Sequence, residues 1–120
     1  MIEIVKTPGT HISYTTTKKN IILGADEDLS INLQIREKDE IVTIDICTDQ
    51  NGELTMGAAA GLRYVAEIEI PARQYVETQE KNESYQEGTD QSEYITKREP
   101  VPFNIDLCTI RLWDWRNKLC

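Results

Sequence analysis

Two glutamates two positions apart, Glu67 and Glu69, have the spacing that could support acid and base chemistry. In an extended strand such positions lie on the same face, so the two carboxylates would project together. Paired carboxylates in different environments can divide the roles of general acid and general base. The alternative, which we favour, is a polar sheet face on which a lysine or arginine of the next strand neutralises both glutamates.

Two short acidic segments suggest a metal ion. The three adjacent carboxylates of Asp26, Glu27 and Asp28 offer hard oxygen donors that suit calcium, although such a run is more often a solvated turn. Segment 49–52, Asp-Gln-Asn-Gly, resembles the start of a calcium loop, but its glycine stands fourth rather than sixth and no glutamate stands twelfth. We predict a hairpin turn there and expect no metal and no cofactor.

The three cysteines and the single histidine do not form a recognisable site. Cys47, Cys108 and Cys120 lack Cys-x-x-Cys spacing, and an odd number of cysteines makes no complete disulfide framework. We expect Cys47 and Cys108 to be small core residues without a reactive role. No residue near His11 ties it to a nucleophile, so the sequence predicts that the protein is not an enzyme.

The net charge limits the classes of partner that the protein is expected to bind. Thirteen basic and 21 acidic residues give a net charge of -8, which disfavours binding to a phosphate backbone or to an anionic membrane surface. We therefore expect neither nucleic acid nor membrane as a partner. The chain opens without a charged and apolar leader, and its longest apolar run is far short of a membrane span. We expect synthesis in a reducing cytoplasm, without secretion by a signal peptide.

Alternation of apolar and polar residues organises most of the chain into strands. The clearest run is 62–75, in which Ala66, Ile68 and Ile70 share one side and Pro71 ends the strand by removing a backbone donor. Segments 29–35 and 42–46 alternate in the same way, and we expect them to pair as an antiparallel hairpin.

Later in the chain, the segment 105–112 changes parity. This change indicates a bulge near Cys108 or a strand covered on both faces. The whole pattern gives about eight short strands and no amphipathic helix. It predicts a single all-β domain over 1–120, a small antiparallel β-sandwich or barrel.

Segment 73–99 is predicted to be a long protruding β-ribbon, with 81–91 as its tip. From Glu77 to Glu99, seven acidic and three basic residues give a net charge of -4. So polar a segment cannot bury enough apolar surface to hold itself rigid, and we expect the tip to be mobile when free. We interpret the ribbon as an arm that docks on a partner by strand addition, rather than as a solubilising flap. The candidate interface residues are Glu77, Glu80, Glu83, Tyr85, Glu87, Asp90 and Glu93.

Two tryptophans, Trp113 and Trp115, would share one face of a terminal strand. Tryptophan is enriched at the centres of protein interfaces, so the pair is a candidate assembly contact. The alternative is that Trp113 simply packs in the core.

The strand Tyr-Val-Ala-Glu-Ile-Glu-Ile-Pro-Ala-Arg-Gln-Tyr (64–75), the acidic stretch after it and the closing Pro-Phe-Asn-Ile-Asp-x-Cys-Thr-Ile-x-Leu-Trp (102–113) resemble small uncharacterised proteins of Firmicutes phages and prophages. Segment 23–51, which contains Leu-Ser-Ile-Asn-Leu-Gln-Ile-Arg-Glu-Lys-Asp, is similar to β-sandwich modules of phage tail and baseplate proteins. It has Glu40 in place of the glycine of their usual Lys-Asp-Gly turn. The resemblance implies a phage setting and a β module, and it carries over no active site.

Two functions are compatible with these features. The first is a non-enzymatic structural or assembly protein of a phage virion, tail or baseplate, in the virion or the host cytoplasm. It would bind other phage proteins or itself as a homo-oligomer. The second is an acidic anti-defence inhibitor that occupies the nucleic-acid groove of a host nuclease. Such a decoy needs its carboxylates on one face, whereas here they are spread from Asp26 to Asp114.

Overall fold

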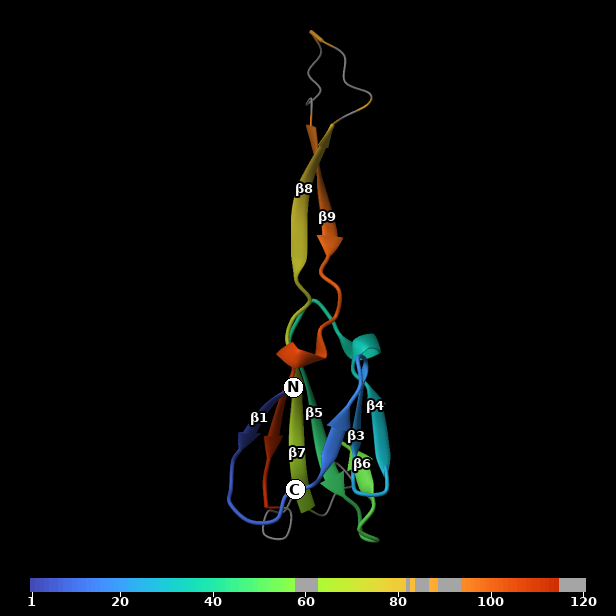
Figure 1. Cartoon of the computed structure of the whole chain (residues 1–120), viewed down its shortest axis with the longest axis vertical. Coiled ribbons are helices and arrows are strands. Elements are labelled where there is room, and N and C mark those ends of the chain that lie inside the picture. Colours follow the sequence, from blue (N-terminus) through green and yellow to red (C-terminus); the bar gives the residue numbers. More distant parts are fainter. Residues whose placement is uncertain (58–62, 82, 84–86, 89–93, 115–120) are drawn as a thin grey trace. The chain divides into compact units, whose positions relative to one another are not determined.

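The computed structural model describes residues 1–57, 63–81, 83, 87–88 and 94–114. The chain forms two compact units, the first made of Met1–Ala72 with Phe103–Cys120 and the second of Arg73–Pro102. The described residues form ten strands and two short 3-10 turns, with no α-helix among them (Figure 1). The all-β prediction is therefore confirmed, with ten strands where the sequence indicated about eight. None of the described segments is a helix of the length and hydropathy that a membrane span requires.

The first unit is built around a five-stranded sheet of order β1-β10-β7-β5-β6. Its members are β1 (Ile2–Val5), β10 (Thr109–Leu112), β7 (Arg63–Ile70), β5 (Val42–Thr48) and β6 (Leu54–Met56). All of its pairs are antiparallel except β1 with β10, which is parallel.

The central strand β7 follows its sequence pattern. Ala66, Ile68 and Ile70 are fully buried, and the strand ends immediately before Pro71, as predicted. Val65 is buried as well, because a register shift between Ile46 and Cys47 of β5 leaves it as an extra residue in β7.

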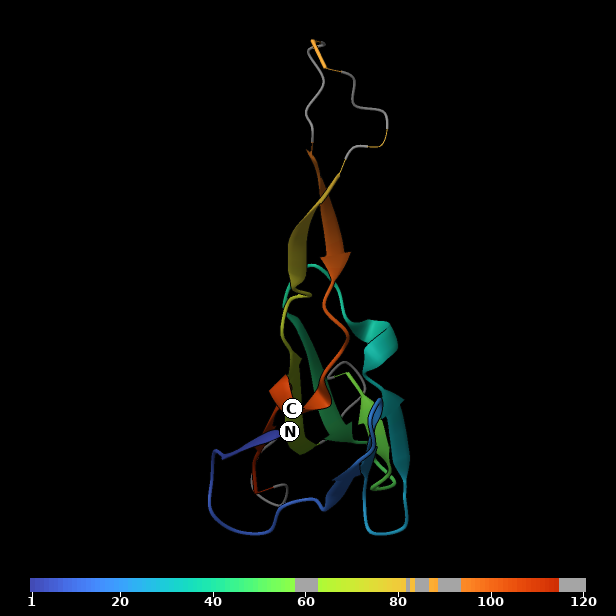
Figure 2. The ribbon, with the colours of Figure 1, turned by 45° about the horizontal axis from the view of Figure 1, so that its top comes forward.

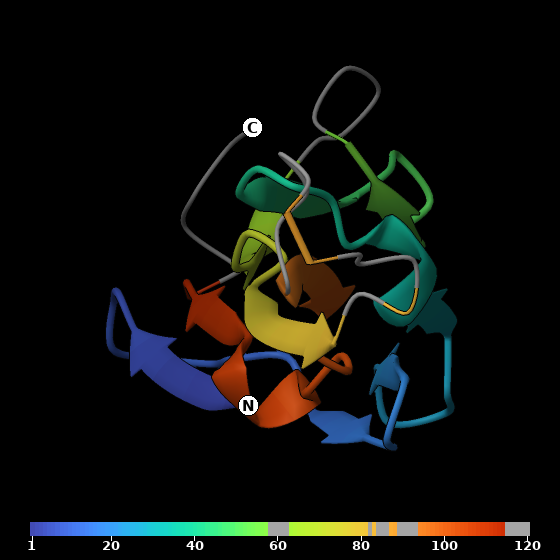
Figure 3. The same cartoon turned by 90° about the horizontal axis from the view of Figure 1, so that it is seen from above.

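A second sheet of three antiparallel strands, in the order β2-β3-β4, completes the core of this unit. It contains β2 (Tyr14–Thr16), β3 (Asn20–Leu23) and β4 (Leu29–Asn32). Buried residues of both sheets form one apolar cluster, as in a small β-sandwich, and the sheets do not close into a barrel (Figures 1 and 3). Burying each of its isoleucines and leucines stabilises the fold by about 1.5–3 kcal/mol. The largest fully buried members are Ile21, Leu23, Leu33, Ile46, Ile68, Ile70 and Ile110.

The predicted hairpin between 29–35 and 42–46 is wrong. β4 pairs with β3, whereas β5 pairs with β6 and β7. The Asn32 side chain accepts a hydrogen bond from the Ile35 amide, and the chain bends into the 3-10 turn η1 (Gln34–Arg36). The two apolar rows do share one core, but they face each other from different sheets instead of lying side by side.

The parity change at 105–112 has a different cause from the two that we predicted. Ile105–Leu107 forms the 3-10 turn η2, which Asn104 caps by accepting a hydrogen bond from the Asp106 amide at 3.0 Å. The strand therefore begins only at Thr109.

The second unit is the predicted ribbon, formed by β8 (Tyr75–Lys81) and β9 (Tyr94–Pro100). The two strands pair antiparallel from Tyr75 opposite Pro100 to Lys81 opposite Tyr94 (Figure 2). Tyr75 is half-buried, and every other residue of both strands is exposed.

Candidate protein interface

Alternate residues of the ribbon form two solvent-facing surfaces, because β8 and β9 pair only with each other. On one surface, Val76 and Ile95 are about half exposed, at 50% and 46%. On the other surface, Tyr94 is 53% exposed. Each strand also has one outer edge with no strand beside it among the described residues, and such an edge presents unpaired N–H and C=O groups. The ribbon thus combines exposed apolar side chains with free backbone edges.

Charge in the ribbon is balanced within its strands. The Lys97 ammonium lies 3.1 Å from Glu80, and the Arg98 guanidinium lies 3.8 Å from the ring centroid of Tyr75. The strands hold three acidic residues, Glu77, Glu80 and Glu99, and three basic residues, Lys81, Lys97 and Arg98. Their net charge is zero. The whole excess of -4 comes from Glu83, Glu87, Asp90 and Glu93, in the connection 82–93, which has no basic residue.

The structure does not gather the candidate interface residues on one face. Glu77 and Glu80 lie on opposite faces of β8, because positions three apart in a strand differ in parity. Glu83 and Glu87 are exposed in the connection. Tyr85, Asp90, Glu93 and Trp115 lie outside the described residues, so their interface role stays a prediction.

Trp113 packs on the first unit, next to β7. Its ring meets the ring of Tyr64 edge to face, with centroids 4.7 Å apart, and its backbone amide donates to the Val65 carbonyl at 3.2 Å. Tyr64 in turn donates a hydrogen bond from its hydroxyl to Asp45. These contacts agree with a packing role for Trp113.

Glu67 and Glu69 form the polar sheet face that we favoured. Arg111 of β10 reaches both, with Nη1 3.0 Å from Glu67 and Nη2 3.3 Å from Glu69. One guanidinium thus holds both carboxylates. The pair therefore does not show the two contrasting environments that acid and base roles require.

The acidic segments form turns. Within the described ranges, no three side chains of histidine, cysteine, aspartate or glutamate gather closely enough to hold a metal ion. Asp49 accepts hydrogen bonds from the amides of Asn51 and Glu53 at 2.8 and 2.9 Å. Gly52 follows with a φ of +79°. The predicted turn at 49–52 is confirmed, because the aspartate oxygen satisfies the turn amides and glycine adopts the left-handed conformation without strain.

Two cysteines are buried in the first unit, as predicted. Cys108 carries a free thiol, whose pKa is raised by burial to about 11, so it stays protonated near neutral pH. Cys47 is disulfide-bonded, which the spacing of the cysteines in the sequence did not predict.

The tyrosines predict a loss of stability at alkaline pH. Burial, together with the hydrogen bond from the Tyr14 hydroxyl to Glu3 at 3.0 Å, raises the Tyr14 pKa to about 12. Burial and Asp45 raise the Tyr64 pKa as well. Unfolded tyrosines lose their protons near pH 10, so the folded state binds more protons above that pH. The buried Cys108 thiol, whose pKa is also raised, adds to this effect from about pH 9, so the free energy of unfolding should fall between about pH 9 and 12.

Urea unfolding across this range, with tyrosinate absorbance as a second readout, measures the effect. Tyr14→Phe should make the decline shallower, because it removes one of the three groups whose pKa is raised. An identical slope in the wild type and in this variant would contradict the assignment to Tyr14.

The exposed apolar residues of the ribbon, Val76, Tyr94 and Ile95, are not among the interface residues predicted from the sequence, which are mostly carboxylates. The signal that could have found them is the presence of apolar residues in otherwise polar strands. No protein-family model, no curated protein and no solved structure matches the chain, so its function has to be inferred from its own residues.

Proposed function

We propose that the protein is a non-enzymatic structural or assembly component of a phage virion, tail or baseplate, and that it acts through protein contacts made by the β8–β9 ribbon. The observation that carries this proposal is the exposure of the two ribbon strands, because Tyr75 alone among the residues of β8 and β9 is partly covered. An isolated two-stranded ribbon is marginally stable in water and gains more when another strand or surface covers it.

Strand addition to a free edge of the ribbon is the mode of contact that this geometry supports. Main-chain hydrogen bonds to the outer edge of β8 or β9 would supply affinity. Val76, Ile95 and Tyr94 would supply specificity by filling apolar sites on the partner. Because the strands carry no net charge, a second copy of the ribbon can approach them without net repulsion from the strands. This supports self-association. The phage setting is supported by the resemblance of 64–75 and 102–113.

The alternative function, a decoy for the nucleic-acid groove of a nuclease, has less support. A decoy needs unpaired carboxylates on one face, whereas Glu80 is paired with Lys97, and Glu67 and Glu69 are paired with Arg111. Within the ribbon, the unbalanced charge of -4 lies in the connection 82–93, and the rest of the net charge of -8 lies elsewhere in the chain.

The first test replaces apolar side chains on one face of the ribbon. The double variant Val76→Thr/Ile95→Thr keeps β-branched residues in both strands and removes exposed apolar surface. It should lower self-association at least tenfold, as measured by sedimentation velocity, with the fold retained. Ile35→Thr is the matched control, because Ile35 is 76% exposed in the first unit and should not affect association. Equal loss in both variants, or a monomeric wild type that is absent from purified particles, would refute the proposal.

A second variant separates the strands from their acidic connection. Replacing 82–93 by Asn-Gly joins the paired residues Lys81 and Tyr94 through a two-residue turn and removes four carboxylates. If the protein acts in assembly, the variant with the Asn-Gly turn should still self-associate, and its self-association should change little with salt. Loss of binding to a basic partner, with wild-type binding released by rising salt, would favour the decoy instead.

A further inference from the structure

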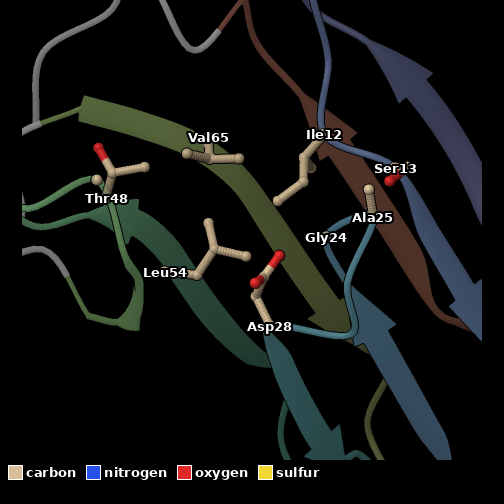
Figure 4. Close-up of a pocket in the computed structure, with 9 residues that line it drawn as sticks. Ile12, Ser13, Gly24, Ala25, Asp28, Thr48, Leu54 and Val65 are labelled. Carbon is tan, nitrogen blue, oxygen red and sulfur yellow. The ribbon is translucent and has the colours of Figure 1, made fainter.

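A pocket of about 290 Å³ opens in the first unit, between strands of the five-stranded sheet and the loops next to β2, β3 and β4 (Figure 4). Its apolar wall comes from Ile12 before β2, Leu54 of β6 and Val65 of β7. The side chains of Ile12, Leu54 and Val65 and the carboxylate of Asp28 point into a common space in Figure 4. An apolar hollow with one convergent charged group is the usual form of a small-ligand site.

Asp28 gives the pocket its charge. The described residues that line the pocket include no lysine, arginine or histidine, and no described residue forms a hydrogen bond or ion pair with the Asp28 carboxylate. An adjoining hollow of about 390 Å³ shares Asp28 and Leu54 with this pocket and adds a second carboxylate, that of Glu53. Both hollows are therefore negative.

The Asp28 side chain lies close against Gly24. The carboxylate packs so closely on Gly24 that any Cβ at that position would collide with it, and Gly24 has a φ of +93°. A residue with a side chain at position 24 would displace the carboxylate.

We propose that this pocket binds a small organic monocation, a primary alkylammonium whose charge pairs with Asp28 and whose apolar stem contacts Ile12, Leu54 and Val65. An anion would be repelled by Asp28 and Glu53. Asp28 is exposed, and a neutral apolar ligand would fill the pocket without pairing with its charge. Calcium needs six to eight oxygen ligands, and two carboxylates among apolar side chains do not provide them.

The size of the pocket limits the ligand. A volume of about 290 Å³ equals that of roughly ten water molecules, which suits an alkylammonium of hexyl length. The described residues that line the pocket belong to the first unit, so the inference is independent of the function proposed for the ribbon.

The test is a titration of the protein with n-hexylammonium, n-hexanol and hexanoate, followed through the NMR methyl signals of Ile12, Leu54 and Val65. We expect saturable shifts with n-hexylammonium, with a dissociation constant on the order of a millimolar. Hexanol should bind more weakly, and hexanoate should give no saturable shift. Binding of hexanoate as tight as that of n-hexylammonium, or absence of saturation with n-hexylammonium, would overturn the proposal.

Two isosteric variants test whether the Asp28 carboxylate supplies the negative charge that pairs with the ligand. Asp28→Asn should weaken n-hexylammonium binding about tenfold, because a hydrogen bond to a charged group is lost. Asp26→Asn is the matched control, since Asp26 lies in the same acidic segment but does not line the pocket, and it should leave binding within twofold. Equal effects of the two variants would refute a direct contact with Asp28.

A lysine side chain carries the same alkylammonium group, so Nα-acetyl-lysine amide serves as a further probe. If it binds as tightly as n-hexylammonium, the natural source is a lysine of a partner protein. Tighter binding of the free amine indicates a small molecule. Both results support the alkylammonium assignment.

Discussion

Ile68→Ala is expected to lower the free energy of unfolding of the first unit by about 3 kcal/mol. Ile68 is fully buried in the central strand β7, where it lies opposite Ile44 of β5 and Ile110 of β10. Truncation leaves a cavity in the apolar core, over the middle of the five-stranded sheet, and the paired strands on both sides of β7 restrict collapse around it. Urea unfolding followed by tryptophan fluorescence measures the loss.

The control for this variant is Val76→Ala in β8. Val76 is 50% exposed, so its truncation should change the free energy of unfolding by less than about 0.5 kcal/mol. A loss below about 1 kcal/mol in Ile68→Ala would contradict the central position of β7 in the core.

Gly24→Ala is expected to cost about 2–3 kcal/mol, the second largest effect. Two separate penalties add up at this position. The φ of +93° is unfavourable for any residue with a Cβ, and the new methyl group would collide with the Asp28 carboxylate. The loss is read from the midpoint and slope of urea unfolding.

Gly57→Ala isolates the backbone penalty. Gly57 has nearly the same φ, +92°, but no atom of the described part of the chain lies within 4 Å of a Cβ added there. We expect it to cost about 1 kcal/mol. In an Asp28→Ala background, Gly24→Ala should lower the free energy of unfolding only as much as Gly57→Ala does, because the new methyl group no longer meets a carboxylate. Equal costs of Gly24→Ala with and without Asp28 would show that the carboxylate is not held against the glycine.

The sequence predicted those parts of the fold that depend on alternation within one segment. The pattern of β7 and its end before Pro71 are encoded by side-chain parity and by a missing backbone donor, and both are local. Strand partners are not local. Alternation shows that 29–35 and 42–46 each have one apolar face, but it does not tell whether those faces lie in one sheet or in two. The observed pairing of β4 with β3, and of β5 with β6 and β7, places them in two sheets, and the chain bends between them where the Ile35 amide donates to the Asn32 side chain.

The candidate sites were predictable to a similar degree. Length and polarity predicted the ribbon, whereas the ion pair of Glu80 with Lys97 depends on the cross-strand register. The three cysteines gave no sign that Cys47 is disulfide-bonded. The pocket was not predicted, because its lining comes from segments as far apart as Ile12 and Val65, which no spacing rule connects.

The parallel pairing of β1 with β10 affects the order in which the first unit can fold. It joins Ile2 to Thr109, so the sheet closes a loop that spans almost all of the chain. Closing so long a loop lowers the entropy of the chain before stabilising contacts form. Topologies with such distant pairings therefore fold slowly. The neighbours β2, β3 and β4 need only short hairpins. During synthesis, β1 must therefore wait without its strand partner until 109–112 has been made, and this exposed strand is the part of the unit most open to non-native pairing with other chains.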